Sequence, residues 1–265
     1  MTTVLITGAA GSIGTVLTAG LPEHGHRLRL LDRQPIENGR VDPDDVFVGD
    51  ISDEAVLDRA MAGADSVVHL AAIPTEAEFA DIDRVNIEGT YRVFAAARRN
   101  GVRRIVYASS NHAVGFTPRA PLVPADVPPR PDTYYGVSKV FGEALGRLYV
   151  DRYGLEVACL RIGSFAQHPR TPRELSTWLS HRDAVHLVHA CLTAPHLTYA
   201  LVWGVSANTR GWWDLEPGRA LGYRPVDDAE AYALDIIAAH GEPDLDDPEH
   251  ALLGGEYTRP EYDRP

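Results

Sequence analysis

Short apolar runs alternate with amphipathic segments through the first 165 residues of the chain. The runs are rich in β-branched and aliphatic residues and cover 4–6, 28–31, 46–48, 66–70, 105–108 and 156–161. Between them, segments such as 54–61 and 85–99 carry apolar residues at helical spacing. This alternation predicts an α/β protein with a Rossmann-like, doubly wound parallel sheet. Ligands of such sheets bind at the carboxyl ends of the strands, so the residues after each run are the candidates for chemistry.

A glycine-rich turn follows the first run and precedes an apolar-periodic helix. Gly8 permits a tight turn, Gly11 lets a pyrophosphate approach the backbone, and Gly14 lets the helix pack closely on the strand. The free amides at the helix start, which include those of Ser12 and Ile13, would then face the phosphates. The order strand, glycine turn, helix therefore predicts a dinucleotide site.

Asp32 ends the second run, at about the distance from the glycines where an acidic residue meets the adenosine ribose. A carboxylate there accepts hydrogen bonds from both ribose hydroxyls and repels a 2'-phosphate, which favours NAD over NADP. Arg33 follows and is open to three interpretations: a phosphate ligand, a cation along the adenine, or a solvated loop residue.

Two further strand ends complete the predicted cofactor cleft. Asp50 and Ile51 follow the third run, where an acidic side chain could meet the adenine amino group. The fourth run ends in Leu70, Ala71 and Ala72, and small residues there let a cofactor ribose pass close to the backbone.

Tyr135 and Lys139 stand four residues apart in a segment predicted to be helical, which places a phenol and an ammonium on one face. A free tyrosine titrates near pH 10, so a phenolate base near neutrality needs a pKa about 3 units lower, roughly 4 kcal/mol. A neighbouring cation can supply much of this stabilisation of the phenolate. Chance also produces this spacing, and Tyr134 is a rival base, but only Tyr135 has a lysine four residues on.

Composition excludes several classes of partner. The net charge of -12, from 25 basic and 37 acidic residues, argues against nucleic acid and anionic membranes, and an anionic substrate would need a local arginine. No apolar stretch is long enough to cross a bilayer, and the N-terminus lacks a basic region ahead of an apolar one. We expect a cytoplasmic protein in which Cys159 and Cys191 are buried thiols.

Taken in order, the motifs resemble the extended short-chain dehydrogenase/reductase family. They are Thr7-Gly8-x-x-Gly11-x-x-Gly14, Asp50-Ile51, His69-Leu70-Ala71-Ala72, Asn86, Ser109-Ser110, Tyr135-x-x-x-Lys139 and Leu160-Arg161. The resemblance implies that Tyr135 is the acid/base, that Lys139 holds the nicotinamide ribose and lowers the tyrosine pKa, and that Ser110 bonds the reacting oxygen. Asn86 and Ile162 join the implied cofactor contacts.

The carboxyl-terminal part narrows the resemblance to the uronate dehydrogenases, short NAD-dependent members that oxidise hexuronic acids at C1. Only 104 residues (265 minus 161) follow Arg161, whereas nucleotide-sugar members generally carry a larger lobe. The motifs are Ser109-Ser110-Asn111-His112, Arg161-Ile162-Gly163-Ser164, Arg173, 176–181, 203–206 and 212–214. The resemblance implies a homo-oligomer that oxidises D-galacturonate or D-glucuronate to the aldarolactone. It divides the chain into an NAD-binding core, 1–161, and an interleaved substrate-binding part with an acidic tail, 162–265.

A uronate needs a cation for its carboxylate and small polar groups around its ring. Arg173 is the preferred clamp and Arg170 the alternative, although both could be surface cations. The family tends to place a serine where this chain has Pro74, so Thr75 either takes over that contact or the contact is lost. Asn111 and His112 could equally be turn residues. The predicted substrate contacts are Thr75, Ser110, Asn111, His112, Ser164 and Arg173.

Two other functions compete with this interpretation. A nucleotide-sugar epimerase would use the same Tyr135 and Lys139 without net NADH release, and a nonenzymatic dinucleotide sensor would have no reason to keep Ser110 beside them. His181, His186 and His189 lie in a predicted helix but have no cysteine or carboxylate in a ligand pattern, so no metal site is expected.

The large aromatics and the tail have structural interpretations. Trp203, Trp212 and Trp213 are expected in the core, with a pocket wall or an oligomer interface as the alternative. The acidic tail 242–265 is predicted to be irregular and draped over the domain through Leu252 and Leu253, or over a partner subunit.

Overall fold

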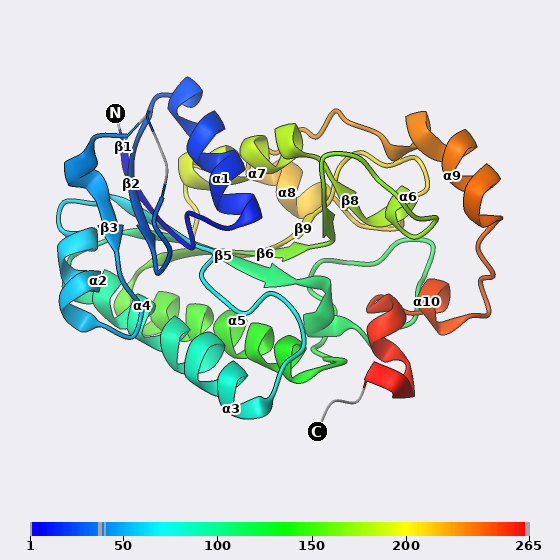
Figure 1. Ribbon diagram of the computed structural model, residues 1–265, viewed down its shortest axis with the longest axis horizontal. Coiled ribbons are helices and arrows are strands. Elements are labelled where there is room, and N and C mark those ends of the chain that lie inside the picture. Colours follow the sequence, from blue (N-terminus) through cyan, green and yellow to red (C-terminus); the bar gives the residue numbers. More distant parts are fainter. Residues whose placement is uncertain (1, 37–38, 40, 263–265) are drawn as a thin grey trace.

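A seven-stranded parallel sheet forms the centre of the protein in the computed structural model, which describes residues 2–36, 39 and 41–262 (Figure 1). Its strand order is β3-β2-β1-β4-β5-β6-β9. The strands are β1 (Thr2–Thr7), β2 (His26–Asp32), β3 (Val46–Val48), β4 (Ser66–His69), β5 (Arg104–Ser110), β6 (Glu156–Ile162) and β9 (Tyr199–Gly204). The order reverses between β1 and β4, which opens a crevice at their carboxyl ends. The predicted fold class is confirmed.

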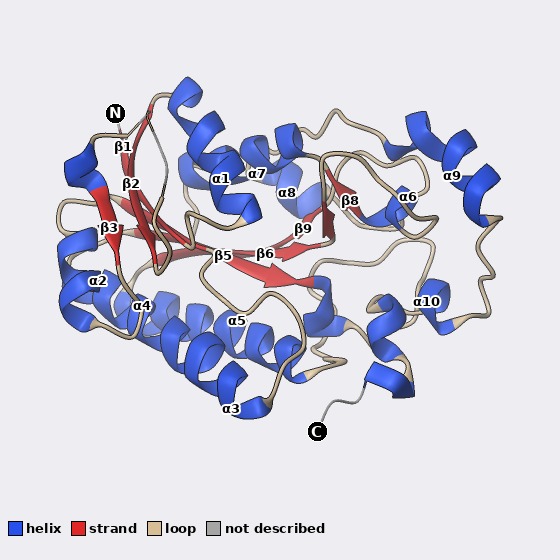
Figure 2. Cartoon of the chain, in the orientation of Figure 1, coloured by secondary structure: helices blue, strands red, loops and turns tan. Residues whose placement is uncertain are grey.

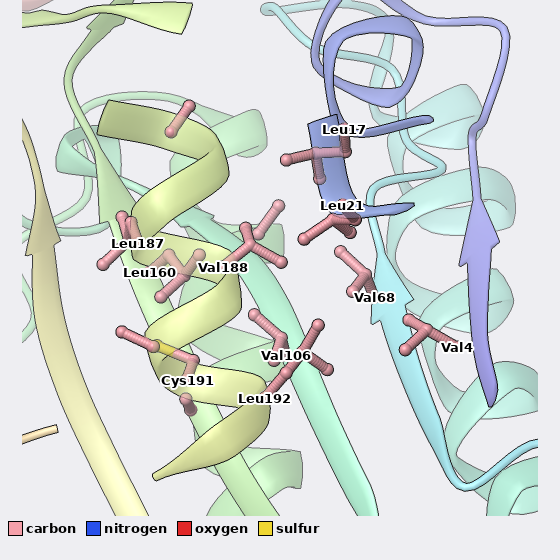
Figure 3. Close-up of a cluster of buried hydrophobic side chains, with 14 of the residues drawn as sticks. Val4, Leu17, Leu21, Val68, Val106, Leu160, Leu187, Val188, Cys191 and Leu192 are labelled. Carbon is pink, nitrogen blue, oxygen red and sulfur yellow. The ribbon is translucent and has the colours of Figure 1, made fainter. Parts of the chain in front are cut away.

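Helices cover both faces of this sheet (Figure 2). One face carries α1 (Ser12–Gly20) and α7 (His181–Thr193), and the other carries α2 (Glu54–Met61), α4 (Gly89–Arg99) and α5 (Tyr134–Tyr153). Apolar side chains of α1 and α7 point at the sheet and pack against side chains of β1, β4, β5 and β6 (Figure 3). Each such fully buried aliphatic side chain contributes about 1.5–3 kcal/mol, so the strand edge that holds the site is rigidly supported.

Short elements connect and extend the two layers. The predicted helix 85–99 differs in detail, because it begins as a π-helical turn over Asp83–Glu88 before α4. A small second sheet pairs β7 (Ser164–Phe165) with β8 (Trp178–Leu179). The remaining helices and turns are η1 (Leu21–His24), η2 (Pro43–Asp45), α3 (Phe79–Ile82), η4 (Asn111–Val114), α6 (Glu174–Thr177), α8 (Glu216–Ala220), η5 (Ala229–Tyr232), α9 (Ala233–His240), α10 (Pro248–Ala251), η6 (Gly255–Thr258) and η7 (Pro260–Tyr262).

The three tryptophans expected in the core are buried, together with the carboxyl-terminal segment. Trp203, Trp212 and Trp213 pack with Val114, Val123 and the fully buried Leu253. Leu252 forms a bridge with Pro118, so the tail lies on its own domain. Cys159 and Cys191 are buried free thiols, as predicted. Among the described residues, no helix combines the length and apolar character needed to span a bilayer.

Candidate active site

A cleft of about 670 Å3 lies at the carboxyl edge of the sheet. It is lined by almost all of the residues that the strand ends and the resemblance predicted for the cofactor. These are Gly8, Gly11, Ser12, Ile13, Gly14, Asp32, Arg33, Asp50, Ile51, Leu70, Ala71, Ala72, Tyr135, Lys139 and Ile162. The predicted catalytic Ser110 lines it too. One crevice therefore joins the glycine turn at one end to the tyrosine and lysine at the other.

Two glycines of the turn are sterically required. Gly8 has φ +76°, and a Cβ on it would lie 2.7 Å from the Ala71 nitrogen. A Cβ on Gly14 would lie 2.3 Å from the Gly8 carbonyl oxygen. The tight turn brings the start of α1 to the cleft, and since no side chain caps this helix, its first amides can bind a phosphate there.

The adenosine end of the cleft has a fixed carboxylate. Asp32 accepts hydrogen bonds from the Ala10 amide at 3.0 Å and the Gln34 amide at 2.9 Å. Near it, the pKa of Asp50 is lowered, chiefly because the backbone amide of Ser52 donates to its carboxylate, with Arg33 adding to the effect. Asp50 is therefore ionised at neutral pH, and both carboxylates line the cleft, where ribose or adenine donors could bind.

Helix α5 presents the catalytic candidates to the other end. Tyr135 is 8% exposed and hydrogen-bonds Ser110, whereas its rival Tyr134 is 45% exposed and packs its ring edge on Phe79. The Lys139 Nζ atom donates to the Ala108 carbonyl at 2.8 Å and lies 5.3 Å from the centroid of the Tyr135 ring. The geometry selects Tyr135 over Tyr134 as the phenol that faces the cleft.

The pKa of Tyr135 departs from expectation. The sequence predicted a lowered value, but burial raises the pKa of Tyr135 to about 12, with its hydrogen bond to Ser110 opposing the rise. Burial also lowers the pKa of Lys139 to about 8. The prediction was wrong for the protein alone, because desolvation of the buried phenol raises its pKa, while the Lys139 ammonium is directed at the Ala108 carbonyl.

The start of α5 is held by two caps. The Thr133 hydroxyl accepts from the Gly136 amide at 2.9 Å. The buried Glu76 carboxylate accepts from the amides of Tyr134 and Tyr135 at 3.2 and 2.8 Å. A carboxylate at a helix N-terminus also meets the positive end of the helix dipole. Glu76 thereby fixes the backbone of Tyr135 from the loop that follows the cleft residue Pro74.

The carboxyl-terminal segment meets four of the predicted substrate residues, and Asn111, Arg173 and Thr75 hydrogen-bond it. The Leu253 carbonyl accepts from Asn111 Nδ2 at 2.7 Å and also from Arg173 Nη2. Arg173 Nη1 donates to the carbonyls of Glu249 and Leu252 at 2.7 and 3.2 Å, and burial lowers the Arg173 pKa to about 10. The Thr75 hydroxyl lies 2.9 Å from the Tyr257 hydroxyl.

The remaining predicted residues have partners within the domain. His112 Nδ1 lies 2.8 Å from Asp132 Oδ2, and the His112 ring lies tilted against Tyr257, with the ring centroids 4.3 Å apart. Ser164 Oγ lies 2.8 Å from the Thr177 hydroxyl. Asn86 is behind the cleft wall, where its amide bonds both backbone groups of Ile73 and the Ser138 hydroxyl. The roles given to these side chains stay predictions.

Comparison with known proteins places this site in a family. The model of the NAD dependent epimerase/dehydratase family matches residues 4–199. The chain belongs to the NAD-dependent epimerase/dehydratase family. This is the wider group that the motifs predicted, and the match spans every strand end described above except that of β9.

Individual proteins match over nearly the whole chain. Uronate dehydrogenase of Agrobacterium fabrum is 42% identical and covers 97% of both chains. A solved mutant of uronate dehydrogenase from Agrobacterium tumefaciens, complexed with NAD, is 41% identical with a TM-score of 0.90, again over 97% of both chains. An NAD-dependent glucose-6-phosphate dehydrogenase of Haloferax volcanii is 38% identical over 91% of this chain and 97% of its own. The predicted resemblance to uronate dehydrogenases is confirmed.

Sequence reasoning missed two kinds of residue in this family's site. The first kind lines the cleft beside predicted residues, and those that follow strand ends, which include Gln34, Pro74, Gly163 and Phe165, could have been found from the strands; Val85, in the π-helical turn, could not. The second kind is Glu76 and Tyr257, which reach the site across 59 and 182 residues of sequence. No local pattern signals such contacts.

Proposed function

We propose that this chain is an NAD-dependent uronate dehydrogenase, which oxidises D-galacturonate or D-glucuronate at C1 to the aldarolactone. The observation that carries the proposal is the placement of Ser110, Tyr135 and Lys139 on one end of a cleft whose other end suits a dinucleotide. Similarity to uronate dehydrogenases over 97% of the chain supports the substrate class.

The residues present fit NAD. Gly8 and Gly14 allow backbone contacts too close for a Cβ, which fold the turn tightly against the start of α1, and no side chain caps that helix start. Asp32 is oriented by two backbone amides, as a carboxylate that receives ribose hydroxyls needs to be. When bound, NAD supplies the hydride acceptor, C4 of its nicotinamide ring.

The chain's own residues handle the proton and the reacting oxygen. The Tyr135 phenolate takes the proton of the C1 hydroxyl, Ser110 bonds O1 as C1 loses its hydride, and O1 becomes the lactone carbonyl oxygen. Ionising a phenol of pKa about 12 at pH 8 costs about 5 kcal/mol, taking 1.36 kcal/mol per unit. The phenolate therefore needs stabilisation in the complex, and the Lys139 ammonium one helical turn away is placed to give it.

On the substrate side, we assign the carboxylate to Arg173 and the ring hydroxyls to Asn111, Ser164, His112 and Thr75. Arg173 and Asn111 already meet at the Leu253 carbonyl, so a substrate carboxylate at Arg173 would share its guanidinium with the tail. A charge-assisted contact of this kind contributes about 1.5–3 kcal/mol. Of these residues, Arg173 and Ser164 belong to the substrate-binding part 162–265, whereas Asn111, His112 and Thr75 belong to the core.

A second candidate is a sugar 1-dehydrogenase that takes a neutral or phosphorylated aldose. The engagement of Arg173 by three tail carbonyls favours a neutral aldose, and the match to an NAD-dependent glucose-6-phosphate dehydrogenase over 91% of the chain favours a phosphorylated one. The two functions separate in one assay, NADH formation followed by near-ultraviolet absorbance with galacturonate, glucuronate, glucose or glucose 6-phosphate. A uronate dehydrogenase responds to the first two sugars only.

We further propose a cytoplasmic homo-oligomer. Its contact would use α4 and α5, which expose the large apolar side chains of Tyr91, Val137, Leu148 and Tyr153. Exposed large apolar side chains of this kind are typical of subunit interfaces. Light scattering tests the oligomer: a monomeric mass at micromolar concentration would contradict it, and a Leu148→Glu variant is expected to shift an oligomer toward smaller species.

A further inference from the structure

A buried carboxylate lies one helical turn beyond Lys139. Glu143 is 4% exposed, and its Oε1 accepts from Ser109 Oγ at 2.6 Å and Arg161 Nε at 2.9 Å. Its Oε2 accepts from Arg161 Nη2 at 2.8 Å. Arg161 is 1% exposed and donates Nη1 to the carbonyls of Ala125 and Val127. The two buried charges are thus paired through two hydrogen bonds, the arrangement in which a buried ion pair is tolerated.

This carboxylate connects the catalytic helix to the end of β5. Ser109, which it binds, precedes the catalytic Ser110 in the chain. Lys139 holds the same strand end by its bond to the Ala108 carbonyl. Lys139 and Glu143 of α5 therefore hydrogen-bond two consecutive residues of β5, Ala108 and Ser109, immediately before Ser110.

Glu143 also affects Lys139 electrostatically. The titratable groups that face Lys139 are His69 of β4, Tyr107 of β5, and Tyr135 and Glu143 of α5. Burial lowers the pKa of His69 to about 3 and raises the pKa of Tyr107, so both are neutral near pH 7. Glu143 raises the pKa of Lys139 against the effect of burial.

The other groups around Glu143 do not add a competing negative charge. Cys159 of β6 and Tyr199 of β9 are neutral near pH 7, because burial raises the pKa of each. Arg161 of β6 is the cation that pairs with Glu143.

We propose that Glu143 is a positioning residue of the active site, which locks the Ser109–Ser110 strand end to the catalytic helix and supplies the negative charge that stabilises the buried Lys139 ammonium. The proposal deepens the proposed function and rests on it for its effect on turnover. Its electrostatic part is measurable without substrate.

The sequence offers a direct probe, because Lys139 is its only lysine. Protein made with lysine labelled with 13C at Cε gives one lysine side-chain NMR signal, whose pH titration reports the pKa of Lys139. In Glu143→Gln we expect that pKa to fall by about one unit or more. Asp151→Asn removes a charge from the exposed part of the same helix, where it pairs with Arg147, and is expected to leave the titration in place.

Ser109→Ala separates the two parts of the proposal. It keeps the Glu143 charge, so the lysine titration should stay, while the loosened strand end lowers kcat about tenfold, of order one hydrogen bond. An unchanged lysine titration in folded Glu143→Gln would overturn the electrostatic part. Unchanged kcat in Ser109→Ala would overturn the positioning part.

Glu143→Gln leaves Arg161 buried and unpaired, so this variant can fail to fold, and a second variant is needed for that case. The double variant Glu143→Gln/Arg161→Gln removes both charges, and its lysine titration is judged by the same criterion. Since this titration uses no sugar or cofactor, it stands even if the substrate is not a uronate, whereas failure of the proposed function would appear only as missing NADH formation.

Discussion

Replacing Tyr135 by phenylalanine removes a single hydroxyl from a buried ring. The hydroxyl is bonded to Ser110, and the ring is packed near His112, so the variant keeps its shape and loses about one hydrogen bond. That costs about 1 kcal/mol, or about 2–4 °C in Tm for a chain of this size. The loss of a general base is larger, about 10²–10⁴-fold in kcat, which corresponds to about 3–5 kcal/mol.

The assay is NADH formation from galacturonate, with NAD affinity measured in parallel by calorimetry. We expect kcat to fall by at least about a hundredfold in Tyr135→Phe, with NAD affinity and Tm near those of the parent. Tyr134→Phe is the matched control, because that neighbouring ring is exposed and lies outside the cleft lining, and it should keep its activity. A Tyr135→Phe enzyme within about tenfold of the parent in kcat would refute the base assignment.

Three other perturbations test separate parts of the account. Gly8→Ala should abolish NAD binding and lower stability by about 1–3 kcal/mol, because its Cβ would strike the Ala71 backbone at positive φ, whereas Gly25→Ala, with φ +81° and no atom within 4 Å, pays only the backbone strain. Calorimetric titration with NAD checks it. Arg173→Met should raise KM for galacturonate about tenfold or more while leaving NAD affinity unchanged; an unchanged KM for galacturonate would mean that Arg173 only anchors the tail. The pKa of His189 is lowered to about 4 by burial and by His24 and His26, so the unfolded chain binds that proton more tightly. Its contribution is present above pH 6.5 and is lost as the pH falls from 6.5 through 4, by at most about 3 kcal/mol and on the order of 1 after solvent screening. Urea denaturation of the parent and of His189→Gln at pH 5 and pH 7 measures it, and an equal pH dependence in both would contradict it.

Much of the cofactor side of the site follows from local sequence. A parallel sheet brings strand ends to one edge, so Gly8, Asp32, Asp50 and Ala71 had to lie near one another once the strands were located. The helix period put Tyr135 and Lys139 on one face in the same way. These inferences needed only residue spacing and topology.

The substrate side depends on contacts that spacing does not reveal. Leu253 and Tyr257 reach Asn111 and Thr75 because the tail folds back beside the tryptophan cluster, and Glu76 reaches the helix of Tyr135 through a loop. The pKa of Tyr135 was misjudged for a related reason. Its value depends on how much water the fold removes from the phenol. The spacing of residues in a sequence predicts a neighbouring charge but does not predict how deeply the phenol is buried.

The central claim is that the cleft oxidises a hexuronic acid with NAD. The direct measurement is near-ultraviolet absorbance of the wild-type protein with NAD and galacturonate or glucuronate, followed by mass analysis of the product. The account predicts NADH formation with a uronate, a product lighter by two hydrogens, and no response to glucose or glucose 6-phosphate. NADH formation with a neutral or phosphorylated aldose, and none with either uronate, would contradict it.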